Sequence, residues 1–321
     1  MNIVYNGSMD PRAFKDVLGK VIPELAEKDA DVIYLDADLM SCIGTAKWGA
    51  AHPDRAINCG IAEANMIGVA AGLASQGFKP ICHTFGCFAS RRVFDQAFLA
   101  AGYTGNDITV IGTDAGITAA FNGGTHMPFE DMALYRAIPT ATVIDIADAN
   151  QLESVLHQVS DIKGVKYIRC SRKAAATVYE AGAEIPVGKG VVLREGKDAV
   201  VFATGIMIHE AFMAAEELAK EGIEIAIVDM FTVKPLDKEI AVKFAKETGA
   251  VVTAENHNKI GGLYSAVTEV LAGEVEVPVE YVAVEDVYGE VGPQDYLRTR
   301  FDLTSDHIVR KVKKAIERKA K

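Results

Sequence analysis

The sequence has 321 residues, of which 50% are hydrophobic and 24% are charged, an ordinary composition for a soluble globular protein of about two domains. Its formal charge of −11 argues against a nucleic-acid-binding surface, because phosphate recognition requires a basic face. No apolar run reaches the roughly 20 residues that span a bilayer. The stretch from Met1 to Arg12 lacks the basic start and apolar core of a signal peptide. We therefore expect a cytoplasmic protein that binds neither membranes nor nucleic acid.

The chain has five cysteines and no Cys-x-x-Cys pair. An odd count in a chain of this length does not indicate a disulfide framework, and buried reduced thiols are expected. Metal binding by Cys82, His83 and Cys87 would require a spacing that matches no standard zinc pattern. We therefore predict no metal ligands in this chain.

Strand-like and helix-like segments alternate through the first half of the chain. The expected elements are a strand at 31–35, a helix at 60–77, a strand at 80–84, a helix at 93–101, a strand at 108–112, a long loop at 114–128, a helix at 129–137, a strand at 141–146, a helix at 150–159 and a strand at 165–169. This alternation predicts βαβ units and a mostly parallel sheet.

Residues 173–190 contain Ala, Gly and Pro without clean periodicity, as in a linker. The alternation then restarts with strands at 199–203, 223–228, 250–254 and 279–284, and with helices at 208–221, 238–247 and after Gly261-Gly262. A solvated helix is expected for the basic tail at 311–321. The sequence thus predicts two α/β domains, 1–180 and 181–321, each a mostly parallel sheet flanked by helices.

Ligands of parallel α/β sheets bind in the loops at the carboxyl ends of the strands. Glu63, in the segment 58–66, stands at or near the start of an apolar helix of small residues. An isolated acid there is most simply a partner of the helix dipole. The next turns, 66–73, carry no charge, so this carboxylate is poorly solvated and could share a proton with a ligand nitrogen.

Three other loops carry unusual residues. Phe85 and Phe88 are either plain core residues or an aromatic shelf for a planar ring, and the arginines that follow at 91–92 are either solvated or phosphate ligands. His126, in the glycine-containing loop 114–128, either satisfies local backbone groups or acts as a catalytic donor. Arg172, after a strand, suits a bidentate contact with a phosphate.

Together these segments are specific, and the chain resembles the transketolase family. Residues 60–74 resemble the helix that carries the cofactor glutamate of the pyrimidine-binding domain, and Phe85 and Phe88 resemble its aromatic pocket. Residues 123–136 resemble its histidine loop, whereas 228–237 and 255–263 resemble the transketolase C-terminal domain. The similarity extends from about residue 12 to residue 315.

One part of the family pattern is missing. The family binds the diphosphate of thiamine diphosphate through Mg²⁺ at a Gly-Asp-Gly motif, and this sequence contains no Gly-Asp-Gly. Mg²⁺ requires oxygen ligands beside a diphosphate. The resemblance therefore implies an N-terminal partner subunit that carries Gly-Asp-Gly and supplies the Mg²⁺ ligands, in a dimer of heterodimers whose shared site lies at the interface.

The resemblance also implies a role for each candidate residue. Glu63 would hydrogen-bond the aminopyrimidine ring of the cofactor, and His126 would donate to sugar oxygens during catalysis. The remaining cofactor contacts would be Asp38, Ile61, Phe85 and Phe88. The remaining substrate contacts would be Arg12, Asp114, Asn122 and Arg172, with Arg172 and Arg12 binding a terminal anionic group. The implied reaction moves a two-carbon ketol unit from a ketose phosphate to an aldose phosphate.

Two positions depart from the family pattern. Asn122 replaces an aspartate that contacts a substrate hydroxyl in many transketolases, and Asp114 stands where many have a histidine near the substrate phosphate. A carboxylate there would repel a phosphate unless an arginine offsets it. The related deoxyxylulose-phosphate synthases also carry an acid there. We interpret the pair as a sign of a non-standard sugar.

Three other assignments compete with the transketolase one. The β subunit of a 2-oxoacid dehydrogenase also supplies a cofactor glutamate, but residues 125–128 and 256–259 favour transketolase. Deoxyxylulose-phosphate synthase normally carries its Gly-Asp-Gly domain on the same chain. A non-catalytic scaffold subunit would have no physical need to retain the catalytic set, which comprises Glu63, Phe85, Phe88 and His126.

Overall fold

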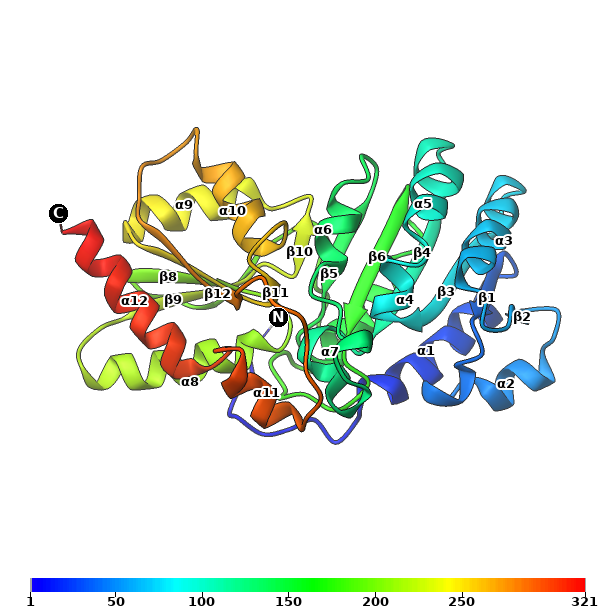
Figure 1. Cartoon of the computed structure of the whole chain (residues 1–321), viewed down its shortest axis with the longest axis horizontal. Coiled ribbons are helices and arrows are strands. Elements are labelled where there is room, and N and C mark those ends of the chain that lie inside the picture. Colours follow the sequence, from blue (N-terminus) through cyan, green and yellow to red (C-terminus); the bar gives the residue numbers. More distant parts are fainter. Residues whose placement is uncertain (1, 321) are drawn as a thin grey trace.

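A computed structural model of the chain describes residues 2–320, so that Met1 and Lys321 lie outside the described residues. Figure 1 shows two α/β units side by side, each built around one sheet. The expected fold class, two mostly parallel sheets flanked by helices, is confirmed. Among the described residues, no helix is both long and apolar enough to cross a membrane.

The first sheet has seven strands in the order β10-β5-β6-β4-β3-β1-β2. Every neighbouring pair is parallel except β10 and β5, which are antiparallel. Its strands are β1(Val32–Asp36), β2(Ala56–Asn58), β3(Lys79–Phe85), β4(Ile108–Thr113), β5(Thr142–Asp145), β6(Val165–Cys170) and β10(Thr232–Lys234). The edge strand β10 comes from the second half of the chain, so the two halves share this sheet.

The helices of the first half surround this sheet. They are α1(Phe14–Lys28), α2(Ala46–Ala51), α3(Glu63–Ser75), α4(Gly86–Ser90), α5(Phe94–Gln96), α6(Asp131–Arg136) and α7(Ala149–Leu156). Short 3₁₀ segments are η1(Met40–Cys42), η3(Gly116–Asn122) and η4(Gly124–His126), and η2(Ala97–Tyr103) is π-helical.

The second sheet has the order β12-β11-β8-β9-β7, with only β7 antiparallel to its neighbour. Its strands are β7(Val191–Arg194), β8(Ala199–Ala203), β9(Ile225–Asp229), β11(Val251–Asn258) and β12(Val279–Val284). The helices are α8(Met207–Lys220), α9(Lys238–Thr248), α10(Leu263–Leu271), α11(Gln294–Arg300) and α12(Ser305–Lys319). The boundary predicted near residue 180 falls between β6 and β7 and stays a prediction.

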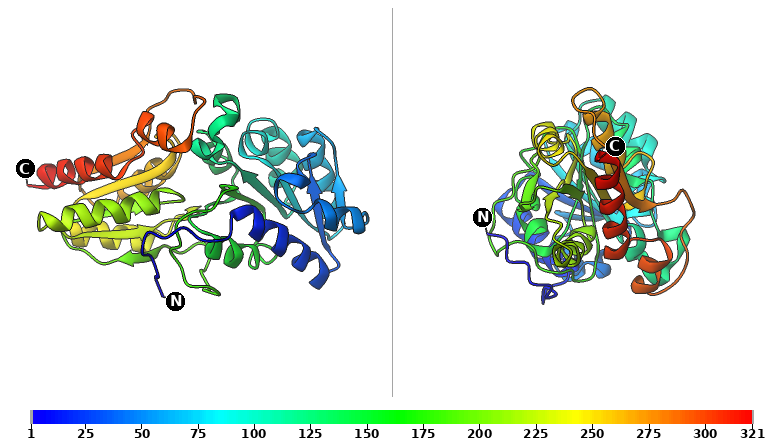
Figure 2. Two further views of the ribbon diagram at one scale, coloured as in Figure 1. Left: turned by 90° about the horizontal axis from the view of Figure 1, so that it is seen from below. Right: turned by 90° about the vertical axis from the view of Figure 1, so that its left-hand side faces the viewer.

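Two hydrophobic cores extend through both halves of the molecule. One contains side chains of α1, α7, α8 and α12, of which α1, α7 and α8 lie below the sheets in Figure 1. The other contains side chains of α3, α6, α9 and α10, which lie above them. The N-terminal segment crosses between the halves, because Ile3 and Met9 form β-bridges to Tyr179 and Ala176 (Figure 2).

The structure corrects several expected elements. The helix expected at 60–77 begins only at Glu63, because Gly60 has φ +71° and residues 59–62 form a loop. The helix expected at 93–101 is α5 followed by the π-helical η2. Three short strands, β2, β7 and β10, were not expected, since strands of three or four residues give no clear periodicity. Four helices, α1, α2, α4 and α11, were not expected from the sequence either.

The basic tail is not simply solvated. Ile308, Val312 and Ala315 of α12 are buried, so the helix is amphipathic and packs against the second sheet. Its basic side chains gather around the buried Glu280, with Arg318 at 2.6 Å. The sequence showed the charge of the tail but not this acidic partner on β12.

The cysteines are all free, as expected, but not all buried. Cys82, Cys87 and Cys170 are buried, and burial raises the pKa of each thiol, that of Cys87 to about 12. Cys42 and Cys59 are half-buried instead, because they lie in loops at the carboxyl ends of β1 and β2.

Candidate functional site

Three aromatic rings meet at the carboxyl end of β3. Phe85 ends this strand, Phe88 lies on α4 and His126 ends η4. The Phe85 and Phe88 ring centroids are 6.3 Å apart, and the His126 ring stands edge-on to both at 6.1 Å and 5.1 Å. The fold therefore brings together the two phenylalanines and the histidine that the sequence singled out.

Glu63 is the first residue of α3, and only 2% of its surface is exposed. Both of its carboxylate oxygens accept hydrogen bonds from Nη1 of Arg92 at 2.8 Å. The same guanidinium lies over the Phe88 ring, 4.1 Å from its centroid. Arg92 thus joins the buried acid to the aromatic group, whereas the sequence suggested only a solvated or phosphate-binding arginine.

Arg91 has a different role. It donates to Glu130 at 2.7 Å and to the carbonyl oxygen of Thr125 at 3.0 Å. Thr125 in turn lies 2.9 Å from Nδ1 of His126 through its hydroxyl. Arg91 therefore holds the histidine loop against α4. Two consecutive arginines beside an aromatic pair were the only sequence signal for these contacts.

A buried polar cluster behind the aromatic group was missed by the sequence analysis. Oδ2 of Asp36 accepts from the hydroxyl of Tyr34 at 2.5 Å and lies 2.8 Å from Nδ1 of His83. Nε2 of His83 lies 3.1 Å from the hydroxyl of Thr113. Asp36 and His83 occupy paired positions on β1 and β3, so their bond fixes the strand ends from which the site loops emerge.

Two predicted cofactor contacts lie on exposed loops. Asp38 has φ +66°, and its carboxylate accepts from Nδ2 of Asn58 at 3.2 Å. Ile61 is 78% exposed, directly before the helix of Glu63. Their contacts with a cofactor stay predictions.

Asp114 and Arg172 form a bidentate ion pair at the ends of β4 and β6. Nε of Arg172 donates to Oδ1 of Asp114 at 2.9 Å, and Nη2 donates to Oδ2 at 2.7 Å. Nδ2 of Asn122 donates to the same carboxylate at 3.1 Å. The guanidinium also lies 4.8 Å from the Phe85 ring centroid, so this group adjoins the aromatic rings. The three predicted substrate residues are therefore neighbours.

A cavity of about 500 Å³ opens beside this ion pair. Asp114, Asn122 and Arg172 line it together with the lysines Lys15 and Lys173. It has the size and the basic groups to take the far end of a small anionic ligand.

Arg12 lies outside the lining of that cavity, on the segment before α1. Its guanidinium donates to Asp10 at 3.2 Å, to Glu153 at 3.0 Å and to Asn150 at 2.5 Å. It therefore ties the N-terminal segment to α7. Its predicted role as a substrate ligand would require it to release one of these partners.

The second half of the chain supports the loop that carries Asp114. Oδ1 of Asn256 accepts from the backbone amide of Ile117 at 3.0 Å, and Nδ2 of Asn256 donates to the carbonyl oxygen of Ala115 at 2.9 Å. A side chain on Gly116, which has φ +50°, would collide with Asn256. The long loop is thus positioned by β11.

A fully buried arginine lies between the two halves. Nε of Arg169 is 2.8 Å from Asp131, Nη1 is 3.2 Å from Asp145, and Nη2 donates to the carbonyl oxygen of Asn256 at 3.0 Å. Burial acts to lower the pKa of Arg169, but the charges of Asp131 and Asp145 outweigh it, and the pKa stands above its ordinary value. We call Arg169, Asp131, Asp145 and Asn256 the seam. The sequence contained no signal for it.

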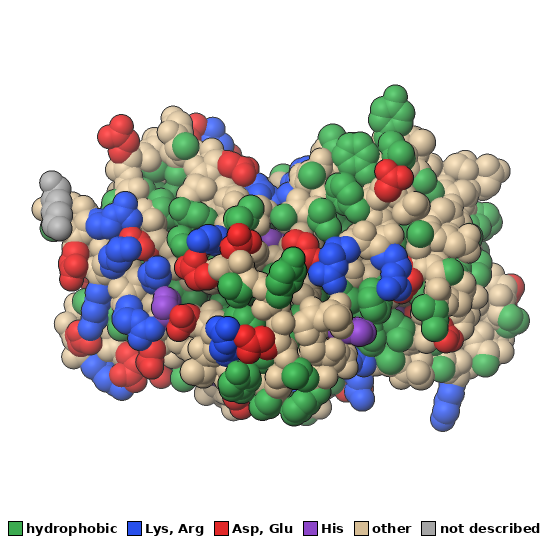
Figure 3. Space-filling model, in the orientation of Figure 1, with side chains coloured by type: hydrophobic (Ala, Val, Ile, Leu, Met, Phe, Trp, Pro, Cys, Tyr) green, Lys and Arg blue, Asp and Glu red, His purple; other side chains and the backbone are tan. Residues whose placement is uncertain are grey.

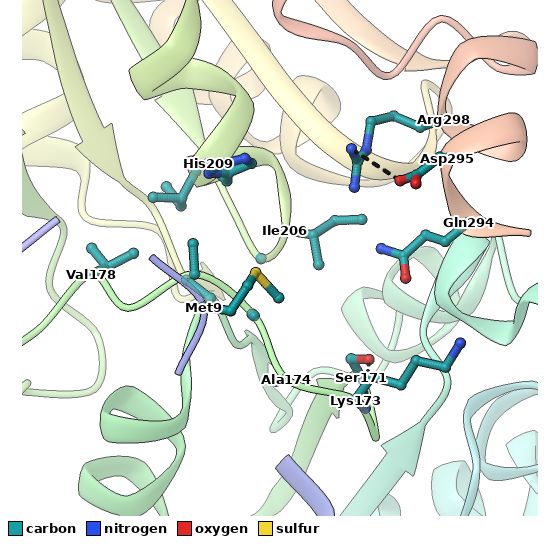
Figure 4. Close-up of a pocket in the computed structure, with 15 residues that line it drawn as sticks. Met9, Ser171, Lys173, Ala174, Val178, Ile206, His209, Gln294, Asp295 and Arg298 are labelled. Carbon is teal, nitrogen blue, oxygen red and sulfur yellow. Dashed lines mark hydrogen bonds and ion pairs between the residues drawn. The ribbon is translucent and has the colours of Figure 1, made fainter. Parts of the chain in front are cut away.

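A second cavity, of about 490 Å³, lies where the N-terminal segment, the end of β6 and the helices α8 and α11 meet. Figure 4 shows His209 on the side of α8 and Arg298 bonded to Asp295 on the side of α11. Lys173 lines both cavities. No aromatic ring of the Glu63 site lines this second cavity, which is separate from it.

The two halves differ in surface character. In Figure 3 hydrophobic side chains gather on the right-hand half, over α4 to α6, and charged side chains are more frequent on the left-hand half, near α12. Large apolar side chains with at least 49% exposure include Ile61, Leu99, Tyr103, Phe121, Tyr288 and Val291. Exposed apolar side chains such as Ile61, two residues before Glu63, suit a surface that another protein covers.

The site fits one half of thiamine diphosphate. A buried carboxylate beside two phenylalanines and a histidine suits an aminopyrimidine ring, which is planar and has nitrogens that exchange protons. The diphosphate half does not fit here. Among residues 2–320, no cluster of three or more His, Cys, Asp or Glu side chains could hold a metal ion.

Comparisons with known proteins identify the same family as the sequence motifs, with one domain match in each half of the chain. Residues 10–177 match the transketolase pyrimidine-binding domain, and residues 188–308 match the transketolase C-terminal domain. Over 319 residues the chain is 45% identical to the 6-deoxy-6-sulfo-D-fructose transketolase subunit SqwH of Clostridium sp. strain MSTE9, covering 99% of each chain. It is 36% identical to a putative transketolase C-terminal section of Methanocaldococcus jannaschii, and the match covers 92% of this chain and 93% of that protein.

Solved structures and longer relatives complete the comparison. A split-gene transketolase, described as an inactive beta4 tetramer, superposes with a TM-score of 0.87 at 39% identity, covering 96% of this chain and 99% of that one. Rat transketolase is 34% identical over 95% of this chain, which spans only 49% of the rat protein. From both domain matches and the near full-length similarity to separate subunits, the chain belongs to the transketolase family of transferases.

Proposed function

We propose that this chain is the C-terminal subunit of a two-chain transketolase and acts only with an N-terminal subunit that carries Gly-Asp-Gly. The observation that supports this most directly is the buried Glu63 carboxylate near the aromatic rings of Phe85, Phe88 and His126, in a sequence without Gly-Asp-Gly. Full-length similarity to proteins described as subunits supports it further. Thiamine diphosphate, with Mg²⁺ held by the partner, would bind where the two chains meet.

Thiamine diphosphate, when bound, supplies the electron sink for cleavage and formation of carbon–carbon bonds. Glu63 holds a proton at the aminopyrimidine nitrogen, which requires Arg92 to give up at least one carboxylate oxygen. Phe85 and Phe88 pack against the ring and exclude water. His126 donates a hydrogen bond to a sugar oxygen as charge develops there.

The substrates would be a donor ketose and an acceptor aldose, each with an anionic group at its far end. The cavity lined by Arg172, Lys15 and Lys173 would hold that group. The relative that shares 45% of its residues is named for 6-deoxy-6-sulfo-D-fructose. We therefore include a 6-sulfonated ketose beside the ketose phosphates as a candidate donor. The acceptor would be an aldose phosphate.

The assembly would be a dimer of heterodimers with closed symmetry. The exposed apolar side chains, among them Ile61 beside Glu63 in the sequence, would provide a contact surface for the partner, which would also complete the cofactor site. A split-gene relative is described as an inactive tetramer of its beta chains, so self-association without activity is expected for this chain alone.

The test is calorimetry of thiamine diphosphate with Mg²⁺, on this chain alone and on its mixture with the Gly-Asp-Gly subunit. Binding that arises only in the mixture is the expected result, and ketol transfer should appear in the same mixture. Tight stoichiometric binding by the isolated chain would contradict the shared site and place the diphosphate within these 321 residues.

A further inference from the structure

The carboxylate of Asp114 accepts hydrogen bonds from two of the N–H donors with which Arg172 could bind an anion. A guanidinium has five N–H donors. The bonds from Nε at 2.9 Å and Nη2 at 2.7 Å use the edge that would otherwise grip a phosphate with two parallel bonds. Three donors remain, all on Nη1 and Nη2. An incoming anion therefore meets an arginine whose charge is already largely offset.

The ion pair is held in place and cannot easily swing aside. The Asp114 side chain is 4% exposed, and Asn122 donates to it at 3.1 Å. Arg172 lies over Phe85 at 4.8 Å, and hydrogen bonds and charge from Asp114 keep its pKa raised although burial acts to lower it. Displacing either partner would leave a poorly solvated charge unpaired, which is costly.

The remaining cations in the cavity are exposed lysines. Lys15 and Lys173 stand at its rim, and both are exposed to solvent. Flexible exposed ammonium groups are screened by water and ions, so their attraction for a monoanion and for a dianion differs less than that of a buried charge. The charge of the bound group is therefore decided mainly by the buried Asp114 and the half-buried Arg172.

This arrangement distinguishes a monoanion from a dianion. Repulsion from a carboxylate grows in proportion to the charge of the bound group. A phosphate monoester carries about −1.5 to −2 at pH 7, with a second pKa of about 6, whereas a sulfonate carries a single charge at every pH above strong acid. We propose that Asp114 acts as a charge filter that favours a donor ketose with a monoanionic terminus, such as a sulfonate, over one with a phosphate dianion. This inference rests on the proposed function, because the donor binds only in the assembled enzyme.

The experiment uses the complex of this chain with its Gly-Asp-Gly subunit, thiamine diphosphate and Mg²⁺. The ratio of kcat/KM for 6-deoxy-6-sulfofructose to that for fructose 6-phosphate is measured at pH 8 for the wild type and for Asp114→Asn. The wild-type ratio should exceed one. The variant ratio should fall by about tenfold, the scale of one additional unit charge beside a carboxylate in a partly exposed site.

Asp107→Asn is the matched control. Asp107 precedes β4, Asp114 follows it, and Asp107 pairs with the exposed Lys163 at 2.8 Å at the opposite end of the strand. The control loses the same formal charge without touching the cavity, so its ratio should equal that of the wild type. Thermal unfolding and cofactor binding of each complex check that the variants are assembled.

A second measurement needs no variant. Lowering the pH of the wild type from 8 to 5.5 protonates the phosphate but not the sulfonate, so the ratio should decrease through pH 6. Effects of pH on the enzyme itself cancel in the ratio. A wild-type preference for phosphate at pH 8, or a ratio unchanged by Asp114→Asn and by pH, would overturn the charge filter while the proposed function stands. Transfer from neither donor, despite bound cofactor, would instead overturn the proposed function.

Discussion

The Glu63 site and the seam are both charged, yet only the seam has both its cation and its acids buried. At the seam, Arg169 is fully buried and contacts two acids and a carbonyl oxygen. At the Glu63 site the acid is buried, but its cation Arg92 has a side chain that is 45% exposed. The seam is packed by both halves of one polypeptide, whereas the Glu63 site opens on the outside of the molecule.

The difference separates structural from functional charge. A fully buried ion pair such as Arg169 with Asp131 contributes to how the halves are arranged, and removing one member leaves uncompensated charge. A pair with an exposed member is weak and can be exchanged for another ligand. The Glu63–Arg92 pair is therefore replaceable by a cofactor, and the seam is not. Four changes test this comparison.

The largest expected effect is at the seam. Arg169→Met leaves Asp131 and Asp145 buried without their cation and should lower the free energy of unfolding by about 3–5 kcal/mol. Urea unfolding measures it. Arg91→Met, which removes an arginine with a 44% exposed side chain, should cost less than about 1 kcal/mol. If Arg169→Met lowered the free energy of unfolding no more than Arg91→Met does, the distinction between the buried seam and the exposed ion pairs would be wrong.

The second effect is on activity. Glu63→Gln keeps the size of the side chain but cannot exchange the proton, so ketol transfer by the assembled complex should fall by about 100-fold or more. Its unfolding and its assembly with the partner should match the wild type. Glu130→Gln is the control. Glu130 directly precedes α6 and pairs with Arg91, the neighbour of Arg92, so this variant should retain most activity. Full activity in Glu63→Gln would remove Glu63 from the mechanism.

The third effect is the pH dependence of stability. Burial raises the pKa of Asp229 to about 7 from the ordinary 3.8, although Tyr179 and Gln151 donate to it. Because the pKa of Asp229 is higher in the folded state, the folded protein binds the proton of this carboxyl more tightly than the unfolded chain does. The protonated carboxyl therefore stabilises the fold fully below about pH 4, and this contribution is lost as the pH rises through 7. Relative to Asp229→Asn, the wild type should lose about 2–3 kcal/mol between pH 5 and pH 8.

Measuring the difference between the two proteins isolates Asp229. Burial raises the pKa of Glu255 to about 7, which gives the same sign, and lowers that of His257 to about 4, which gives the opposite sign. Both groups are present in each protein and cancel. Parallel stability profiles for wild type and Asp229→Asn, from chemical denaturation at several pH values, would contradict the prediction.

The smallest effect is at Arg92. Arg92→Ala frees the Glu63 carboxylate and should strengthen thiamine-diphosphate binding by the complex about two- to fivefold, the scale of a partly exposed ion pair. Calorimetry measures it, with Arg91→Ala as the control that should leave the affinity unchanged. Weaker binding in Arg92→Ala would mean that Arg92 contacts the cofactor instead of competing with it.

Much of the fold was predictable because most strands and helices carry their own periodicity. The long buried strands β3, β4 and β6 and the helices α8 and α9 lie within a few residues of where they were expected. The edge strands β2, β7 and β10 were missed, since three or four residues rarely form a pattern. The strand β10 also joins a sheet formed by the other half of the chain, which no local signal could indicate.

The candidate site divides in the same way. Glu63, Phe85, Phe88 and His126 could be found because each lies within a continuous motif, and the missing Gly-Asp-Gly could be noticed by reading alone. Neighbouring residues of one loop keep their relation whatever the rest of the chain does. The sequence by itself thus determined the family and the architecture of two mostly parallel sheets, and it predicted the residues that carry the chemistry.

Only the tertiary structure decided which charges meet. Arg92 and Glu63 are 29 residues apart in the chain, Arg169 and Asp131 are 38 apart, and Arg172 and Asp114 are 58 apart. The Arg172–Asp114 pair forms because β6 and β4 are neighbours in the sheet although β5 lies between them in the chain, and the other two pairs involve residues of helices or loops that the fold brings together. Periodicity encodes which face of an element is buried but not which element becomes its neighbour, so these pairings follow only from the assembled fold.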